Sequence, residues 1–170
     1  FWIDLFTQAR QWGLIVYEQD WLITQTKKFT PLQTDLHLGE QWLMSMGQAA
    51  DQLDINLQYC MSLPRHILTS LQIPRVTQTR TSTDYAFHLE GKADQWAIGI
   101  SSMFANALGL APFKDVLWST SQQPGAPYPS SPHEENPDRE IVIATLSMAP
   151  VAIGDGINYT SVRTAMQCCR

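Results

Sequence analysis

The feature that most constrains the fold is an alternation of short apolar runs with segments of helical periodicity. The runs are rich in β-branched and aromatic residues, as buried strands are. We expect strands near 14–20, 56–61, 75–80, 114–119 and 150–154. No hairpin turn such as Asn-Gly joins neighbouring runs. Alternating β and α units therefore predict a parallel α/β sheet with strands adjacent in sequence order, either open and doubly wound or part of a (β/α)8 barrel.

The segments between the runs carry apolar residues at helical spacing. Helices are predicted over 2–12, 40–53, 64–71, from Asp94 to about 108, and over 160–169. Residues 141–148 fit a strand or a helix, and a helix is favoured because a further strand follows. Loops are predicted at 21–38, 81–93 and 119–137. Long loops after strand ends are typical of the active-site face of a barrel, and there is no G-x-G-x-x-G or P-loop to favour a nucleotide-binding open sheet.

Composition narrows the possible partners and cofactors. The 170 residues are 44% hydrophobic and only 16% charged, with a net charge of -5. So low a charged fraction predicts that much of the chain is interior to something larger. The start at Phe1, within an apolar helical pattern, predicts a piece of a longer protein, cut at both ends. No basic stripe favours nucleic acid and no apolar stretch is long enough for a membrane span. The four histidines are scattered, so no metal or other cofactor is expected. One glycosylation sequon at Asn158 favours the secretory route.

Two aspartates, Asp20 and Asp84, follow the first and third of these runs. Parallel barrels keep their chemistry at the carboxyl ends of the strands. Two carboxylates from different strands can converge on one substrate, and a facing pair of carboxylates is the apparatus of glycoside hydrolysis. The two aspartates are therefore the predicted catalytic pair.

The motifs resemble those of the α-galactosidase clan, which includes the melibiase and raffinose synthase families. Arg80-Thr81-Ser82-Thr83-Asp84 is similar to the clan's acid/base motif, in which an Arg precedes the acid/base Asp by four residues at the sixth barrel strand. The order also matches: a strand ending in Asp20, one ending at Cys60, then the Arg-x-x-x-Asp strand. The segment 115–119 is similar to the seventh strand and 151–155 to the last. The resemblance implies a TIM-barrel fragment with strands four to eight, residues 1–170 being a partial catalytic domain.

The resemblance also assigns roles. Asp20 would be the nucleophile of a retaining mechanism, and Asp84 the general acid and then the general base. Arg80 would bind sugar hydroxyls and hold a carboxylate, and Trp21 and Trp118 would stack on a sugar ring. The remaining predicted substrate-binding residues are Glu18, Cys60 and Asp115, with Cys60 not expected to be a reactive thiol. With substrate bound, the two aspartate carboxyl groups should lie about 5–5.5 Å apart.

One departure keeps other interpretations open. The clan often has Lys-x-Asp at the nucleophile, whereas this chain has Glu18-Gln19-Asp20. An acceptor carboxylate in place of a donor cation changes what the pocket recognises, so the sugar is not fixed. A catalytically inactive barrel that binds carbohydrate or a partner protein is the first alternative. A barrel isomerase or lyase using the same carboxylates is the second.

Overall fold

The computed structural model describes residues 1–89, 91–92, 95–125 and 133–169. The chain divides into two compact units. Unit 1 comprises Phe1–Arg80 with Ala107–Leu110, and unit 2 comprises Thr81–Asn106 with Ala111–Arg170. Successive strands are neighbours in the order β1-β2-β3-β4, with helices between them. The chain is thus an α/β domain with a four-stranded parallel sheet, as the alternation of runs predicts.

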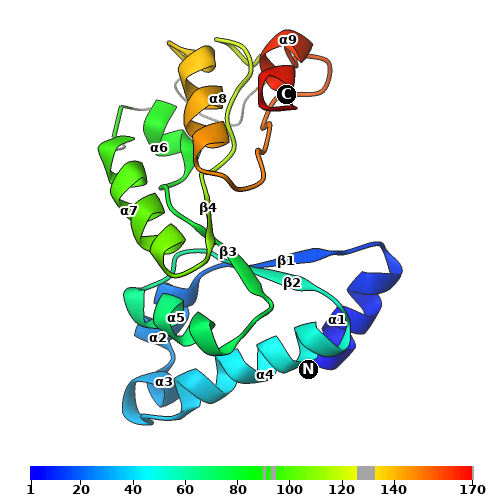
Figure 1. Cartoon of the computed structure of the whole chain (residues 1–170), viewed down its shortest axis with the longest axis vertical. Helices are drawn as coiled ribbons and strands as arrows, with labels where there is room; N and C mark the ends of the chain where they lie inside the picture. The colour runs from blue at the N-terminus through cyan, green and yellow to red at the C-terminus, as the bar shows by residue number, and fades with distance from the viewer. Residues whose placement is uncertain (90, 93–94, 126–132, 170) are drawn as a thin grey trace. The chain divides into compact units, whose positions relative to one another are not determined.

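Unit 1 is a parallel sheet with helices on one side (Figure 1). Its elements are α1 (Trp2–Gln11), β1 (Val16–Gln19), α2 (Leu22–Lys28), α3 (Thr30–Thr34), α4 (Leu38–Gln52), β2 (Asn56–Tyr59), α5 (Pro64–Thr69), a 3-10 turn (Ser70–Gln72) and β3 (Val76–Arg80). The ladders pair Gln19 with Tyr59 and Tyr59 with Thr79. The carboxyl ends of all three strands therefore lie at one edge of the sheet.

The helices bury the aromatic side of the sheet. Tyr17 of β1 meets Trp2 and Phe6 of α1, with ring centroids 6.1 and 5.1 Å away. Leu57 and Tyr59 of β2 are fully buried. Because side chains alternate along a strand, residues 18, 58 and 78 point to the opposite side of the sheet. All three of these are polar, being Glu18, Gln58 and Gln78.

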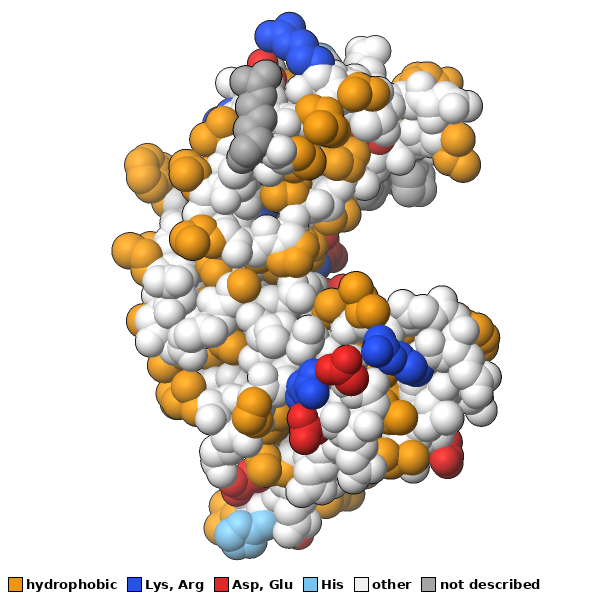
Figure 2. All heavy atoms as spheres, turned by 45° about the vertical axis from the view of Figure 1, so that its right-hand side comes forward, with side chains coloured by type: hydrophobic (Ala, Val, Ile, Leu, Met, Phe, Trp, Pro, Cys, Tyr) orange, Lys and Arg blue, Asp and Glu red, His pale blue; other side chains and the backbone are white. Residues whose placement is uncertain are grey.

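Exposed ion pairs lie at the other end of the strands in unit 1. Arg75, just before β3, pairs with Asp51 at 2.8 Å and with Asp54 at 2.7 Å, and Arg10 lies 3.5 Å from Asp54. Figure 2 shows acidic and basic side chains side by side on this unit. Exposed pairs of this kind contribute little to stability because water and salt screen them, so the apolar core carries the stability.

Unit 2 is built around a small apolar cluster. Its elements are α6 (Tyr85–Leu89), α7 (Gln95–Ala107), β4 (Ala111–Phe113), α8 (Pro137–Leu146), α9 (Val162–Ala165) and a 3-10 turn (Met166–Cys169). The cluster consists of Tyr85, Leu117, Trp118, Ile141 and Ala144. Thr81 donates its backbone N–H to Phe113 O at 2.9 Å, which ties β4 to the residue that follows β3.

The three strands of unit 1 are confirmed, whereas the later strand predictions are wrong in extent. The structure places β4 at Ala111–Phe113, before the predicted 114–119, and Leu117 and Ile153 form only a single parallel bridge. Side chains take the backbone donors that a ladder would use. The N–H of Asp115 donates to Ser82 Oγ at 2.9 Å, and that of Ser119 to Asp155 Oδ1 at 2.8 Å. Local side-chain acceptors of this kind compete with strand pairing.

Two of the predicted loops contain helices. Residues 21–38 include α2 and α3, and 81–93 includes α6. Polar and β-branched residues, such as the threonines of α2, hide the helical signal, while the fully buried Leu22 anchors α2. The ambiguous segment 141–148 is helical, as favoured, but its helix begins at Pro137, where Asn136 Oδ1 caps Arg139 N–H at 3.0 Å. The predicted start at Asp94 lies outside the described residues.

The close approach of α4 to the residues before β3 gives a stability test. A Cβ at Gly47 would lie 2.2 Å from Ile73 Cγ2, and Ile73 is buried and stiff at χ1. We expect Gly47→Ala to lower the free energy of unfolding by about 1–3 kcal/mol through overpacking. Gly39→Ala, in the same helix with nothing within 4 Å of its Cβ, should raise it by up to about 1 kcal/mol. Urea unfolding measures both, and equal effects would contradict this packing.

Candidate functional site

Three of the predicted site residues form a row across the carboxyl edge of the unit 1 sheet. Asp20 follows β1, Cys60 follows β2 and Arg80 ends β3. The register of Gln19, Tyr59 and Thr79 makes these three residues neighbours, and Cys60 N–H donates to Gln19 O at 3.0 Å. Residues at equal register in a parallel sheet point to the same face. The structure therefore brings these three residues together at one edge of the sheet.

The Cys60 sulfur lies between the charged groups of the row. Arg80 Nη1 donates to Cys60 Sγ at 3.7 Å. Burial raises the pKa of the Cys60 thiol to about 12, and the charges of Asp20 and Glu18 act in the same direction against that of Arg80. The thiol therefore stays protonated. It is a neighbour of both charged groups and not a nucleophile.

Trp21, the next residue, also contacts the Asp20 carboxylate. Its backbone N–H donates to Asp20 Oδ1 at 2.6 Å. The residue adopts φ 65°, a left-handed conformation that is strained for a bulky side chain. Its ring is 56% exposed, as a stacking surface for a sugar would have to be. Glu18, two residues before Asp20 on the same strand face, is also exposed.

A cavity in unit 1 lies elsewhere. It measures about 510 Å³ and is bordered by side chains of α3, α4 and α5, among them Trp42 and Arg65. These residues belong to the helices, on the side of the sheet away from the Asp20 row. We base the candidate site on the row, because the chemistry of parallel α/β folds is found at the carboxyl ends of strands.

Asp84 and Asp115 lie together in unit 2. Asp84 is exposed and directly precedes α6, and Asp115 Oδ2 accepts a hydrogen bond from the backbone N–H of Tyr85 at 2.6 Å. Asp115 thus caps the start of α6 beside Asp84. Asp20 belongs to unit 1, and its distance to Asp84 stays the prediction made from the sequence.

Trp118 occupies an apolar environment in unit 2. It is 3% exposed and its ring meets Tyr85 edge-on, with centroids 6.0 Å apart. Its main contact within this unit is the apolar cluster. The predicted stacking of Trp118 on a sugar stays a prediction.

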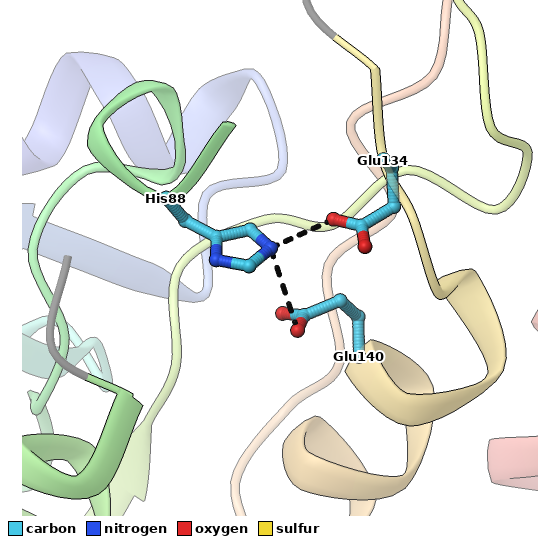
Figure 3. Close-up of side chains that lie close together, drawn as sticks. All are labelled: His88, Glu134 and Glu140. Carbon is cyan, nitrogen blue, oxygen red and sulfur yellow. Dashed lines mark hydrogen bonds and ion pairs between the residues drawn. The ribbon is translucent and has the colours of Figure 1, made fainter. Parts of the chain in front are cut away.

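Sequence reasoning missed a buried polar network in unit 2, drawn in part in Figure 3. Glu134 and Glu140 are both fully buried. His88 Nε2 lies 2.8 Å from Glu134 Oε2 and 3.5 Å from Glu140 Oε1. Tyr85 Oη donates to Glu134 Oε2 at 2.6 Å. Lys114 Nζ and Glu140 Oε2 form an ion pair at 3.0 Å, but their geometry does not meet that of a hydrogen bond. No sequence motif indicates the network, because its histidine lies far in the sequence from its two glutamates.

His88, Glu134 and Glu140 are also the residues of the described chain that could hold a metal ion, since their ligand atoms lie within 4.8 Å of one another. Their charges are already matched by the protein. The Lys114 ammonium adjoins Glu140, and Arg139 Nη2 lies 3.2 Å from Glu140 Oε1 and 3.9 Å from Glu134 Oε1. A divalent ion would have to displace the buried Lys114. We therefore interpret the cluster as an internal ion network.

Hydrogen bonds determine the charge of Glu134. Burial acts to raise its pKa, but hydrogen bonds from His88, Tyr85 and the Asn136 N–H outweigh it and lower the pKa to about 2. Glu134 therefore stays ionised in the folded state even at low pH, where an unfolded glutamate takes up a proton.

This difference predicts a specific loss of stability in acid. The contribution of Glu134 is present above its ordinary pKa of 4.5 and is lost as pH falls through about 2. It amounts to at most about 3 kcal/mol, because one pKa unit corresponds to about 1.4 kcal/mol. Urea unfolding between pH 2 and 6 should show a shallower pH dependence for Glu134→Gln. Glu135→Gln, which changes the exposed neighbour, should keep the wild-type dependence. Parallel curves for all three proteins would disprove this assignment.

Comparisons with protein-family models, curated proteins and solved structures found no match for this chain. In the described part of the chain, no helix is long and apolar enough to cross a membrane.

Proposed function

We propose that this chain is part of a (β/α)8-barrel enzyme that cleaves α-linked glycosides, or transfers their sugar, with retention of configuration. The observation that carries the proposal is the Asp20–Cys60–Arg80 row. A carboxylate stands at the carboxyl end of a parallel strand and accepts a hydrogen bond from the Trp21 N–H, and Cys60 and the Arg80 guanidinium lie in the same row. The arrangement supports Asp20 as a fixed nucleophile.

The chemistry takes two steps. In the first, an Asp20 oxygen attacks the anomeric carbon, the glycosidic bond breaks, and Asp84 gives its proton to the leaving oxygen. In the second, Asp84 takes a proton from water, whose oxygen attacks the anomeric carbon and releases the Asp20 carboxylate. A second sugar hydroxyl in place of that water gives transfer instead of hydrolysis.

The surroundings of Asp20 support a nucleophile that is held in place. The Trp21 N–H donates to its carboxylate at 2.6 Å, and Cys60 follows the neighbouring strand at the same register. A hydrogen bond of this kind orients a carboxylate for attack on a bound sugar. Arg80, on the other side of Cys60, is placed to bind a sugar hydroxyl or a second carboxylate.

A binding protein without catalysis is the second candidate, and Glu18 is the observation that favours it. Its exposed carboxylate lies on the same strand face as Asp20, so the site adds a negative charge where a retaining mechanism needs a single nucleophile. This barrel would bind a carbohydrate through the same row and turn nothing over.

Covalent trapping separates the two candidates. A mechanism-based fluorosugar forms an ester with a catalytic nucleophile and only a reversible complex with a binding site. We expect peptide mass mapping to find the sugar on Asp20. Asp20→Ala should neither be labelled nor turn over any glycoside, whereas the exposed Asp4→Ala should behave as wild type. A wild-type protein that binds the sugar but is never labelled would favour the binding protein.

The role of Asp84 has its own signature. Asp84→Ala should lose about 10²–10⁴-fold in kcat/KM on glycosides with poor leaving groups and far less on activated aryl glycosides, because a leaving group of low pKa departs without protonation. Added azide should speed turnover of the activated substrates by replacing the water that Asp84 no longer activates. Equal losses on all substrates, with no effect of azide, would show that Asp84 is not the acid/base.

A further inference from the structure

We infer that Asp115 and the buried network around Glu134 form a positioning device for Asp84. The inference rests on the proposed function, in which Asp84 is the acid/base, and adds residues to which the resemblance gives no such role. Several hydrogen bonds connect the segment that carries Asp84 to the interior of unit 2.

The first ties bracket Asp84 within its own loop. On one side, Ser82 Oγ accepts a hydrogen bond from the Asp115 N–H at 2.9 Å. On the other, Asp115 Oδ2 accepts one from the Tyr85 N–H at 2.6 Å. One residue thus binds the backbone or side chain on both sides of Asp84, so residues 83 and 84 span a short closed loop. These two contacts give Asp115 a positioning role, which is distinct from the predicted contact with substrate.

The second set of ties holds α6, the helix that Asp84 precedes. A helix of five residues is too short to be stable alone, so its place depends on side-chain contacts. Tyr85 Oη donates to Glu134 Oε2 at 2.6 Å, and His88 Nε2 is hydrogen-bonded to the same oxygen at 2.8 Å. The Tyr85 ring stacks on His88, with centroids 5.4 Å apart, and lies under Lys114 Nζ at 4.8 Å.

Glu134 is itself held in a single orientation. Its second oxygen, Oε1, accepts the Asn136 N–H at 2.8 Å, and its backbone N–H donates to Ser121 O at 2.9 Å. The carboxylate is fully buried, so water does not compete for these bonds. Glu134 therefore fixes Tyr85 and His88 within unit 2. Figure 3 shows the contact between Glu134 and His88.

Such rigidity matters for an exposed acid/base. Proton transfer requires the carboxyl group to lie within hydrogen-bond reach of the leaving oxygen and to be held within about 0.5 Å of its productive position. An aspartate at the start of a one-turn helix is placed no more precisely than the helix that it precedes. The buried network supplies it from behind, while the Asp84 side chain stays at the surface. The network residues are therefore positioning residues and not catalytic ones.

The test is a linear free-energy series on the full-length protein. A screen of 4-nitrophenyl α-glycosides of common hexoses first finds the sugar that is turned over best. kcat/KM is then measured for aryl glycosides of that sugar across leaving-group pKa. Tyr85→Phe removes the hydroxyl that donates to Glu134, and Ser82→Ala removes the acceptor for Asp115. Tyr59→Phe is the matched control, because the buried Tyr59 hydroxyl in unit 1 has no hydrogen-bond partner.

A positioning role gives a result that general destabilisation does not. We expect both variants to lose roughly tenfold in kcat/KM on the poorest leaving groups, a part of the 10²–10⁴-fold that general acid catalysis supplies. On 2,4-dinitrophenyl glycosides the loss should be within about twofold, so the plot against leaving-group pKa steepens. Tyr59→Phe should keep the wild-type slope.

Each other outcome decides a different question. Suppose that the wild type turns over glycosides and both variants keep its slope. The positioning role is then overturned and the proposed function stands. The same conclusion holds if both variants lose activity equally on all substrates, as a smaller folded fraction would cause. If the wild type turns over none of the glycosides, the proposed function is overturned and this inference with it.

Discussion

The candidate site depends on the parallel register of β1, β2 and β3. Because Gln19, Tyr59 and Thr79 are paired across the three strands, the residue after each of them falls in one row at one edge. A shift of one residue in β2 would turn Cys60 toward the helices and bring Tyr59 to the polar face. The aromatic packing of Tyr17 on α1 and the full burial of Leu57 and Tyr59 oppose that shift. The packing on the helix-covered face therefore fixes the geometry of the face that carries the candidate site.

Unit 2 contains two fully buried carboxylates, those of Glu134 and Glu140. Burying two carboxylates costs several kcal/mol each unless charged and hydrogen-bonding partners replace water. Glu134 has Tyr85 and His88 as partners. Glu140 has Lys114 and Arg139. Removing one partner leaves a buried charge without compensation, so the network resists piecemeal change. It gives the small apolar cluster a unique arrangement that five hydrophobic residues would not specify by themselves.

The sequence predicts the fold and the site to different extents. Alternating β-branched runs and helical periodicity are local signals, so the parallel order and the positions of β1 to β3 follow from them. The Asp20–Cys60–Arg80 row follows as well, because strand ends at equal register must meet. The short β4, the single bridge at Leu117 and the helix at Leu22–Lys28 depend on tertiary contacts that take over backbone donors or bury one anchor residue. The Glu134 network joins residues with no spacing rule, and only the folded chain shows it.

Trp21 shows how stability and recognition can pull apart at one position. Its backbone stands at φ 65°, where glycine is at ease and a tryptophan costs on the order of 1–3 kcal/mol. Its ring is more than half exposed and recovers little of that cost through burial. A sequence optimised for thermal endurance alone would place glycine here, whereas one that needs a flat apolar surface beside Asp20 keeps the indole. Attempts to stabilise the protein by relaxing its strained backbone positions would therefore remove an aromatic surface from the edge of the candidate site.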